Sequence, residues 1–125
     1  MILIVDAHAA LWALGDPDRL SADARAALMS PANVVVISVA SIWEIAVKRV
    51  AGRLDAPANV AQGLEALGFS AIPISAADAE RAAELPMHHH DPFDRMVIAQ
   101  ALRLDAVVVT RDPAFGAYDV ELLSA

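Results

Sequence analysis

Three short, unbroken apolar segments constrain what this chain can fold into. They are Met1–Val5, Val34–Ile37 and Val107–Val109, and aliphatic residues fill each of them. A strand with one face in water alternates apolar and polar residues, whereas a strand buried on both faces is apolar throughout. The segments are also far shorter than the roughly 20 residues that span a bilayer. They therefore predict inner strands of a sheet that is covered on both sides.

Helical segments are expected between these strands, and two weaker strand candidates complete the pattern. The weaker candidates are Phe69–Ile74, which Pro73 limits to a sheet edge, and Val120–Leu123. Strands that alternate with helices are typical of parallel sheets. We therefore expect an α/β fold, a three-layer α/β/α sandwich with a mostly parallel central sheet. The expected helices are Ala9–Leu14, one capped by Ser21 and ending near Met29, Ala40–Ala51, Ala58–Leu67, one capped by Ser75 and ending at Leu85, and Phe93–Leu104.

Composition narrows the class of protein. With 125 residues, 58% of them hydrophobic, and no cysteine, the chain is expected to form one globular domain over residues 1–125 without disulfides or thiolate metal sites. The first apolar segment is too short for a signal peptide, so a cytoplasmic protein is expected. A formal net charge of −7 argues against a protein that coats nucleic acid regardless of sequence. It does not exclude an enzyme that touches a short stretch of nucleic acid.

Four acidic residues stand where parallel sheets gather their ligands. Asp6 follows the first strand and Asp112 follows the third inner strand, at the edge where the carboxyl ends of parallel strands meet. Glu44 and Asp94 lie in apolar stretches of predicted helices. An unpaired buried carboxylate is costly and tends to be protonated, whereas a shared divalent cation would keep it ionised. Oxygen ligands without cysteine favour Mg²⁺ or Mn²⁺.

Each acid also has a purely structural interpretation. Asp6 can cap the helix that follows it, and Asp94 can cap its own helix. Glu44 can pair with Lys48 four residues later on a solvated helix face. Asp112 is a suitable turn residue before a proline. No single acid is therefore diagnostic, but the set of four in this order is informative.

Sequence segments around these acids resemble a known family over nearly the whole chain. The segments are Val5–Trp12, Ser38–Ile45, His89–Arg95 and Val109–Pro113. They resemble the PIN-domain ribonucleases, and more closely the VapC-type toxins of bacterial toxin–antitoxin pairs. By this resemblance, Asp6, Glu44, Asp94 and Asp112 correspond to the family's acidic quartet, with Asp6 and Asp94 as direct Mg²⁺ ligands. Ala7 departs from the threonine or serine that the family often has beside its first aspartate.

The resemblance implies a Mg²⁺- or Mn²⁺-dependent endoribonuclease that acts as the toxin of a toxin–antitoxin pair. Metal held by carboxylates can polarise a phosphodiester and activate water to cleave RNA, with one or two ions. The resemblance also implies a cognate antitoxin and a homodimer. An acidic pocket would attract a basic residue of the antitoxin, and Leu11 and Trp12 offer apolar contacts for an amphipathic partner helix.

Residues beside the acids have two interpretations each. Arg95 and Arg111 flank two of the acids and can receive RNA phosphates, or form salt bridges inside the acidic cluster. Thr110 can position a water or a substrate atom, or be a strand-end hydroxyl without such a role. The run His88–His90 points in several directions, which suits one tight metal site badly and favours substrate contact or a plain polar loop.

Two other kinds of protein share part of this pattern. A receiver-type Mg²⁺-binding signalling domain needs a pair of acids after its first strand and a lysine after its last, but Asp6 is followed by Ala7 and the only lysine is Lys48. A catalytically idle PIN-like scaffold that binds a partner protein is the second alternative. Four carboxylates without a ligand would repel one another in such a scaffold.

Overall fold

Five short strands form one parallel sheet in the computed structural model, which describes residues 1–125. The sheet order is β3-β2-β1-β4-β5, so the strand nearest the amino terminus is the central one. The three apolar segments of the sequence are its three inner strands, as predicted, and the two weaker candidates are its edges. The strands are β1 (Ile2–Val5), β2 (Val34–Ser38), β3 (Ser70–Ile72), β4 (Val107–Thr110) and β5 (Glu121–Ser124).

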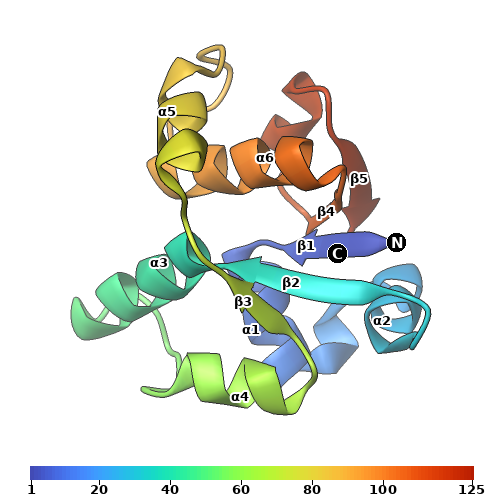
Figure 1. Cartoon of the computed structure of the whole chain (residues 1–125). Helices are drawn as coiled ribbons and strands as arrows, with labels where there is room; N and C mark the ends of the chain where they lie inside the picture. Colours follow the sequence, from blue (N-terminus) through green and yellow to red (C-terminus); the bar gives the residue numbers. More distant parts are fainter.

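Helices cover both faces of the sheet and make the expected three-layer α/β/α sandwich. Figure 1 shows α5 and α6 on one face and α1, α2 and α4 on the other, while α3 packs against both α1 and α6. The helices are α1 (Ala7–Gly15), α2 (Ala22–Met29), α3 (Val39–Val50), α4 (Val60–Ala66), α5 (Ala76–Glu84) and α6 (Pro92–Leu104), with short 3₁₀ helices η1 (Pro17–Arg19) and η2 (Pro113–Ala117).

The central strand explains why its sequence is apolar without alternation. Leu3 and Val5 pack with residues of α1, α2 and α4, whereas Ile4 between them packs with α6 and with Phe115 of η2. All three strand residues are fully buried. Both faces of β1 are therefore core, as the unbroken apolar pattern predicts.

Capping interactions set the ends of the helices. Helix α1 begins at Ala7, two residues before the predicted start, because the Asp6 side chain accepts a hydrogen bond from the backbone N–H of Ala9. The capping box predicted at Ser75 is present, with Asp78 as its second member. The 3₁₀ helix η2 was not predicted. It begins after Asp112, whose carboxylate accepts a hydrogen bond from Ala114 N–H.

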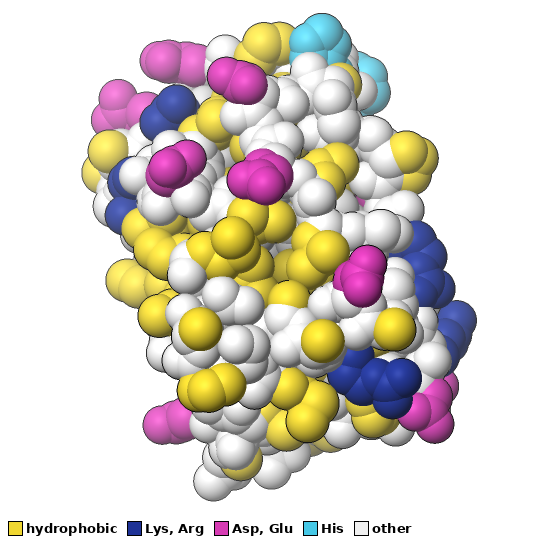
Figure 2. All heavy atoms as spheres, turned by 90° about the vertical axis from the view of Figure 1, so that its right-hand side faces the viewer, with side chains coloured by type: hydrophobic (Ala, Val, Ile, Leu, Met, Phe, Trp, Pro, Cys, Tyr) yellow, Lys and Arg dark blue, Asp and Glu magenta, His cyan; other side chains and the backbone are white.

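Exposed apolar side chains gather at the end of the molecule where the strands begin. Met1, Met29, Val34 and Leu122 are exposed there, and Figure 2 shows hydrophobic side chains across this face with acidic side chains scattered among them. None of the helices combines the length and the hydrophobicity that crossing a membrane requires. The candidate site lies at the other end of the strands.

Candidate active site

The carboxyl ends of β1 and β4 bring Asp6 and Thr110 together in the core. Asp6 is 6% exposed; its Oδ1 accepts a hydrogen bond from Ala9 N–H at 2.8 Å, and its Oδ2 accepts one from the Thr110 hydroxyl at 2.5 Å. Burial raises the pKa of Asp6, although these two hydrogen bonds oppose the shift. The helix-capping role expected as the alternative for Asp6 is thus present, and its carboxylate is held rigidly at the strand end.

Thr110 forms hydrogen bonds with two of the four acidic residues. It is 3% exposed, its hydroxyl donates to Asp6, and its oxygen accepts the backbone N–H of Asp112 at 3.0 Å. The hydroxyl has only one proton to donate. A contact of Thr110 with a substrate atom or a water stays a prediction, which its burial and these two hydrogen bonds do not favour.

Asp94 lies in the first turn of α6, beside a histidine and a second acid. His89 Nε2 is 2.9 Å from Asp94 Oδ2 and 3.4 Å from Asp112 Oδ2. Asp94 is not the cap of its helix, because Asp91 accepts the first backbone N–H groups. Burial, with the charges of Asp91 and Glu44, raises the pKa of Asp94 to about 7.

Glu44 combines a paired oxygen with an unpaired one. On α3 it is 4% exposed, and its Oε2 lies 2.5 Å from Lys48 Nζ in the predicted pair between residues four apart. The pair does not lie on a solvated face, which corrects that part of the expectation. Glu44 Oε1 is buried without any hydrogen-bond partner, and the Glu44 charge raises the pKa of both Asp6 and Asp94.

These donors suit a divalent cation. Ligand atoms of His89, Asp94 and Asp112 lie within 4.8 Å of one another, and the Asp112 side chain is 42% exposed, so solvent reaches the cluster on that side. A buried carboxylate oxygen without a partner, such as Glu44 Oε1, carries an unmet cost that a cation would remove. The residues present therefore fit Mg²⁺ or Mn²⁺, which prefer oxygen ligands.

Arg95 is not available to a substrate. It is 6% exposed, and its guanidinium donates to backbone carbonyls and to the Tyr118 hydroxyl oxygen. The prediction of a phosphate contact is wrong, and so is the alternative of a salt bridge, because the guanidinium is occupied by carbonyls of the last turn of α5 and of the α5–α6 connection. These carbonyls belong to Ala82, Ala83, Leu85, Pro86 and His89.

Arg111 also turns away from the acids. It donates to the backbone carbonyls of Ala125 and Arg19, and its guanidinium carbon lies 4.2 Å from the centre of the Trp12 ring. No Asp or Glu side chain lies within ion-pair distance of Arg111. The salt bridge considered for Arg111 is therefore absent, and its contact with RNA stays a prediction that these contacts do not favour.

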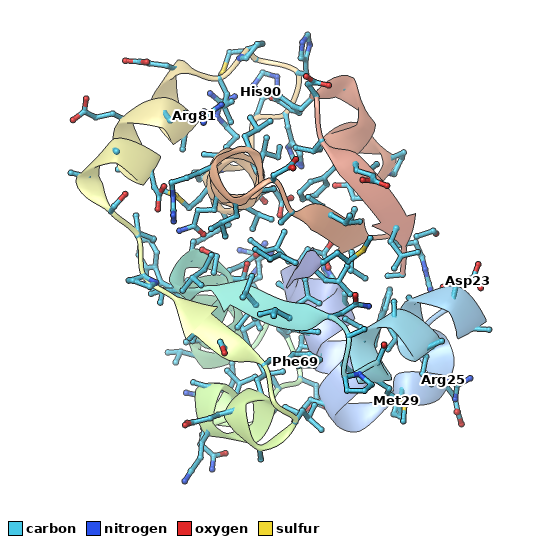
Figure 3. All side chains as sticks on the ribbon, turned by 45° about the vertical axis from the view of Figure 1, so that its right-hand side comes forward. Asp23, Arg25, Met29, Phe69, Arg81 and His90 are labelled. Atoms are coloured by element: carbon cyan, nitrogen blue, oxygen red, sulfur yellow. The ribbon has the colours of Figure 1, made fainter.

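The three consecutive histidines have three different environments. His89 lies in the acidic cluster, whereas His88 packs edge-on against Tyr118 with ring centres 5.3 Å apart. His90 is exposed on the loop between α5 and α6, as Figure 3 shows. Composition alone does not separate His89 from its two identical neighbours. The available signal was spacing: His89 precedes the helix cap Asp91 by two residues, and its Nδ1 accepts the N–H of that cap.

The sequence profile of the PIN domain matches residues 3–121, nearly the whole chain. The chain belongs to the PIN domain family. No curated protein matches this PIN domain at the level of sequence. The parallel sheet of five strands, with Asp6 and Asp112 near the carboxyl ends of β1 and β4, agrees with the α/β fold expected from the sequence.

Solved structures share the fold of this PIN domain. One is VapBC2 from Rickettsia felis, in a crystal structure with a DNA fragment from the VapBC2 promoter. It has a TM-score of 0.72 and 16% identity, and the match covers 98% of both chains. A toxin–antitoxin complex from Klebsiella pneumoniae has a TM-score of 0.63 and 22% identity, covering 98% of this chain and 96% of the other. FitAcB from Neisseria gonorrhoeae has a TM-score of 0.62 and 19% identity, covering 99% and 97%. At these identities the similarity establishes the fold.

Proposed function

We propose that this PIN domain is a Mg²⁺- or Mn²⁺-dependent endoribonuclease that acts as the toxin of a toxin–antitoxin pair. The observation that carries the proposal is the unpartnered Glu44 Oε1, buried among the charges of Asp6 and Asp94. Asp94 in turn shares His89 with Asp112. Buried carboxylates that face one another repel, so their convergence is best explained by a cation that they share.

The four acids have different parts in this proposal. Asp94, Asp112 and the free Oε1 of Glu44 would hold the cation together with Asp6, whose oxygens each keep a lone pair beyond their present hydrogen bonds. The bound cation would supply Lewis acidity to the RNA phosphodiester. Thr110 keeps Asp6 in place, and Lys48 balances part of the charge on Glu44.

Cleavage of RNA with and without metal tests the activity. We expect cleavage with Mg²⁺ or Mn²⁺, none in EDTA, and a loss of several powers of ten in Asp6→Asn and Asp94→Asn, because each change removes a ligand charge. Asp23→Asn, the same change on the exposed surface of α2 (Figure 3), should leave cleavage unchanged. Full cleavage in EDTA would contradict the metal mechanism. Folded protein without any metal-dependent cleavage would favour the idle scaffold.

An antitoxin is the proposed protein partner. One of the similar solved structures is a toxin–antitoxin complex. Half-buried Leu11 and Trp12 line a cavity of about 600 Å³ on α1 with His8 and Arg19, which offers apolar contacts to a partner segment. Co-expression with the product of the neighbouring reading frame should give a complex that survives gel filtration, and the complex should cleave RNA more slowly than the free chain.

A second copy of the chain is the proposed partner in a homodimer. Helix α3 exposes the α3 stripe, an apolar row at helical spacing made of Val39, Trp43, Val47 and Val50, which are 40%, 62%, 45% and 76% exposed. The Trp43 ring packs edge-on against Phe93 beside Asp94. An apolar row of this kind is more typical of a contact surface than of a solvated helix face.

A further inference from the structure

We infer that the cavity on α1, called the α1 cavity below, takes a nucleotide of single-stranded RNA beside the acidic site. The cavity measures about 600 Å³, and its lining includes His8, Leu11, Trp12, Asp16, Arg19 and Asp55. The inference rests on the proposed function for the identity of its ligand, RNA. It adds a binding position for a nucleotide next to the phosphodiester bond that the cation would meet.

The first support is where the cavity begins. His8 lies in the first turn of α1, two residues after Asp6, whose carboxylate caps the same helix. The residues of α1 that line the cavity share one face of the helix, over which α1 rises by about 10 Å. They are His8, Leu11, Trp12 and Gly15. The cavity therefore leads away from the first acid along α1, where the next nucleotide of a strand held at the acids would lie.

The second support is a guanidinium without a partner. Arg19 is exposed at the cavity, and its guanidinium forms no hydrogen bond or ion pair; its carbon lies 5.1 Å from the centre of the Trp12 ring. Arg111, which also contacts this ring, is already held by backbone carbonyls. A guanidinium can donate two parallel hydrogen bonds to one phosphate. Arg19 therefore offers the cavity a phosphate-binding group that no other contact occupies.

The third support is the planar groups in the lining. The ring centres of His8 and Trp12 are 6.1 Å apart and the rings are inclined by 49°, so they do not lie face to face. Proteins that recognise single-stranded RNA stack its bases on aromatic rings and on guanidinium planes. The cavity combines such groups with the charge of Arg19, which matches the base and the phosphate of one nucleotide.

The polar residues of the lining narrow the class of ligand. Only three of the eight lining residues are hydrophobic, which favours a polar ligand. Asp16 and Asp55 are exposed there and form no ion pair, so they would repel a bare phosphate. A nucleotide also carries base amino groups, which donate hydrogen bonds to carboxylates.

The same cavity would receive the antitoxin segment proposed above, through Leu11 and Trp12. A nucleotide and a protein segment cannot fill it together. A bound antitoxin would therefore keep RNA out of the α1 cavity, in addition to any effect on the acids.

The two tryptophans of the chain allow the position of bound RNA to be measured. Trp12 lies in the α1 cavity and Trp43 on the α3 stripe. The probe is a random single-stranded RNA of about ten nucleotides, in EDTA at low salt, where no cleavage is expected. It should quench the fluorescence of Trp43→Phe, whose only tryptophan is Trp12, and leave that of Trp12→Phe unchanged. Phenylalanine keeps an aromatic ring at both positions.

The contact with Arg19 is measured by the fluorescence anisotropy of the same RNA, carrying a dye. Arg19→Met should weaken binding by about 5- to 10-fold at low salt. It should also reduce the slope of log K against log salt concentration by about 0.7, the value for one phosphate contact with a single strand. Arg81→Met removes the same charge from the exposed surface of α5 (Figure 3), on the opposite face of the sheet, and should bind within about twofold of wild type.

Three outcomes would overturn the inference. Equal weakening in Arg19→Met and Arg81→Met would mean that only the overall charge matters. Quenching of Trp43 instead of Trp12 would place the RNA on α3. Folded wild type that binds no RNA would leave the cavity to a protein partner. If a tryptophan variant does not fold, the two arginine variants still decide.

Cleavage assays separate this inference from the proposed function. The expected binding pattern without any metal-dependent cleavage would contradict the nuclease alone. Metal-dependent cleavage with the same KM for wild type and Arg19→Met, and without the expected binding pattern, would contradict the α1 cavity alone. A higher KM in Arg19→Met with an unchanged kcat supports both.

Discussion

Asp94 makes the stability of the metal-free protein depend on pH. Burial and the charges of Asp91 and Glu44 raise its pKa to about 7, from an ordinary value of 3.8. Between these values the folded protein binds a proton that the unfolded chain has released, so each rise in pH favours unfolding. We expect the contribution of Asp94 to the free energy of unfolding to be complete below about pH 4 and lost as pH rises through about 7. Urea unfolding in EDTA at pH 5 and pH 8 measures this.

The variant Asp94→Asn separates this effect from other titrations. At pH 8 the metal-free variant should be as stable as wild type or more stable, because repulsion from Glu44 and Asp6 is relieved. Relief of about 1 kcal/mol raises the melting temperature by a few degrees in a domain of this size. At pH 5, where wild-type Asp94 is protonated, the two proteins should melt together. A metal-free variant that melts well below wild type at pH 8 would mean that Asp94 serves the fold rather than a cation.

For single residues, the sequence predicts some positions in the structure and not others. Asp6 and Asp112 could be chosen because strand ends in parallel sheets are recognisable from apolar runs. The burial of Arg95 could not, because its partners are carbonyls of a loop whose path depends on how α5 packs on α6. The position of His89 depends on the same loop. The position of a side chain at a strand end can thus be predicted from the sequence, whereas the position of a side chain whose contacts depend on the path of a loop cannot.

Asp78 joins two helices on the α5–α6 face. Its carboxylate, 2% exposed, accepts hydrogen bonds from Arg103 at 2.6 and 3.1 Å, from Gln100 at 3.1 Å, and from the backbone of Ser75 at 3.2 Å. Burial by itself raises the pKa of Asp78, but these hydrogen bonds outweigh it and bring the pKa to about 2. The stabilisation is therefore present above about pH 4 and lost as pH falls toward 2.

Asp78→Asn should weaken the attachment of α5. We expect the free energy of unfolding at pH 7 to fall by about 1 to 2 kcal/mol, since Arg103 is partly solvated, and the difference from wild type to narrow as pH falls from 4 toward 2. Asp18→Asn is the control, because the Asp18 side chain is 88% exposed in its pair with Arg25 and should change stability by less than about 0.5 kcal/mol. Equal losses in the two variants would contradict an anchoring role.

Helices and strands were easier to predict than their ends. Periodicity and capping residues identified every regular strand and α-helix of the fold, including the capping box at Ser75. The start of α1 differed because Asp6 serves both as a strand-end acid and as a helix cap. The 3₁₀ helix Pro113–Ala117 has no hydrophobic period of its own, since Phe115 alone enters the core. A short helix with a single core residue has too few apolar positions for a hydrophobic period to be detected in the sequence.

Binding of a cation should stabilise the whole fold. A ligand that binds only the native state raises the free energy of unfolding by mass action, by about 2.7 kcal/mol at a hundredfold excess over Kd. Thermal scans should therefore show that Mn²⁺ raises the melting temperature of wild type by several degrees. Asp6→Asn, which removes a charge from the site, should gain much less, while Asp23→Asn on α2 should gain as much as wild type. An equal gain in Asp6→Asn would contradict the assignment of Asp6 to the cation.

Assembly is tested on the α3 stripe. Light scattering at micromolar concentration should give a dimer for wild type and a monomer for Trp43→Glu, because a charge in an apolar contact is costly to bury. Leu67→Glu, at a residue that is 47% exposed and directly follows α4, serves as the matched control and should remain a dimer. A wild-type monomer would contradict the homodimer, and a dimeric Trp43→Glu would place the contact elsewhere.

The order of strands in the sheet has a consequence for the time at which the molecule becomes active. Strand β1 is made first, yet it lies in the middle of the sheet, between β2 and β4. The hydroxyl that holds Asp6 belongs to Thr110, 104 residues later, and Asp94 and Asp112 also come late. A chain still emerging from the ribosome therefore carries the first acid without the others. If the protein cuts RNA, a nascent copy cannot cut its own message before Thr110 and Asp112 have left the ribosome.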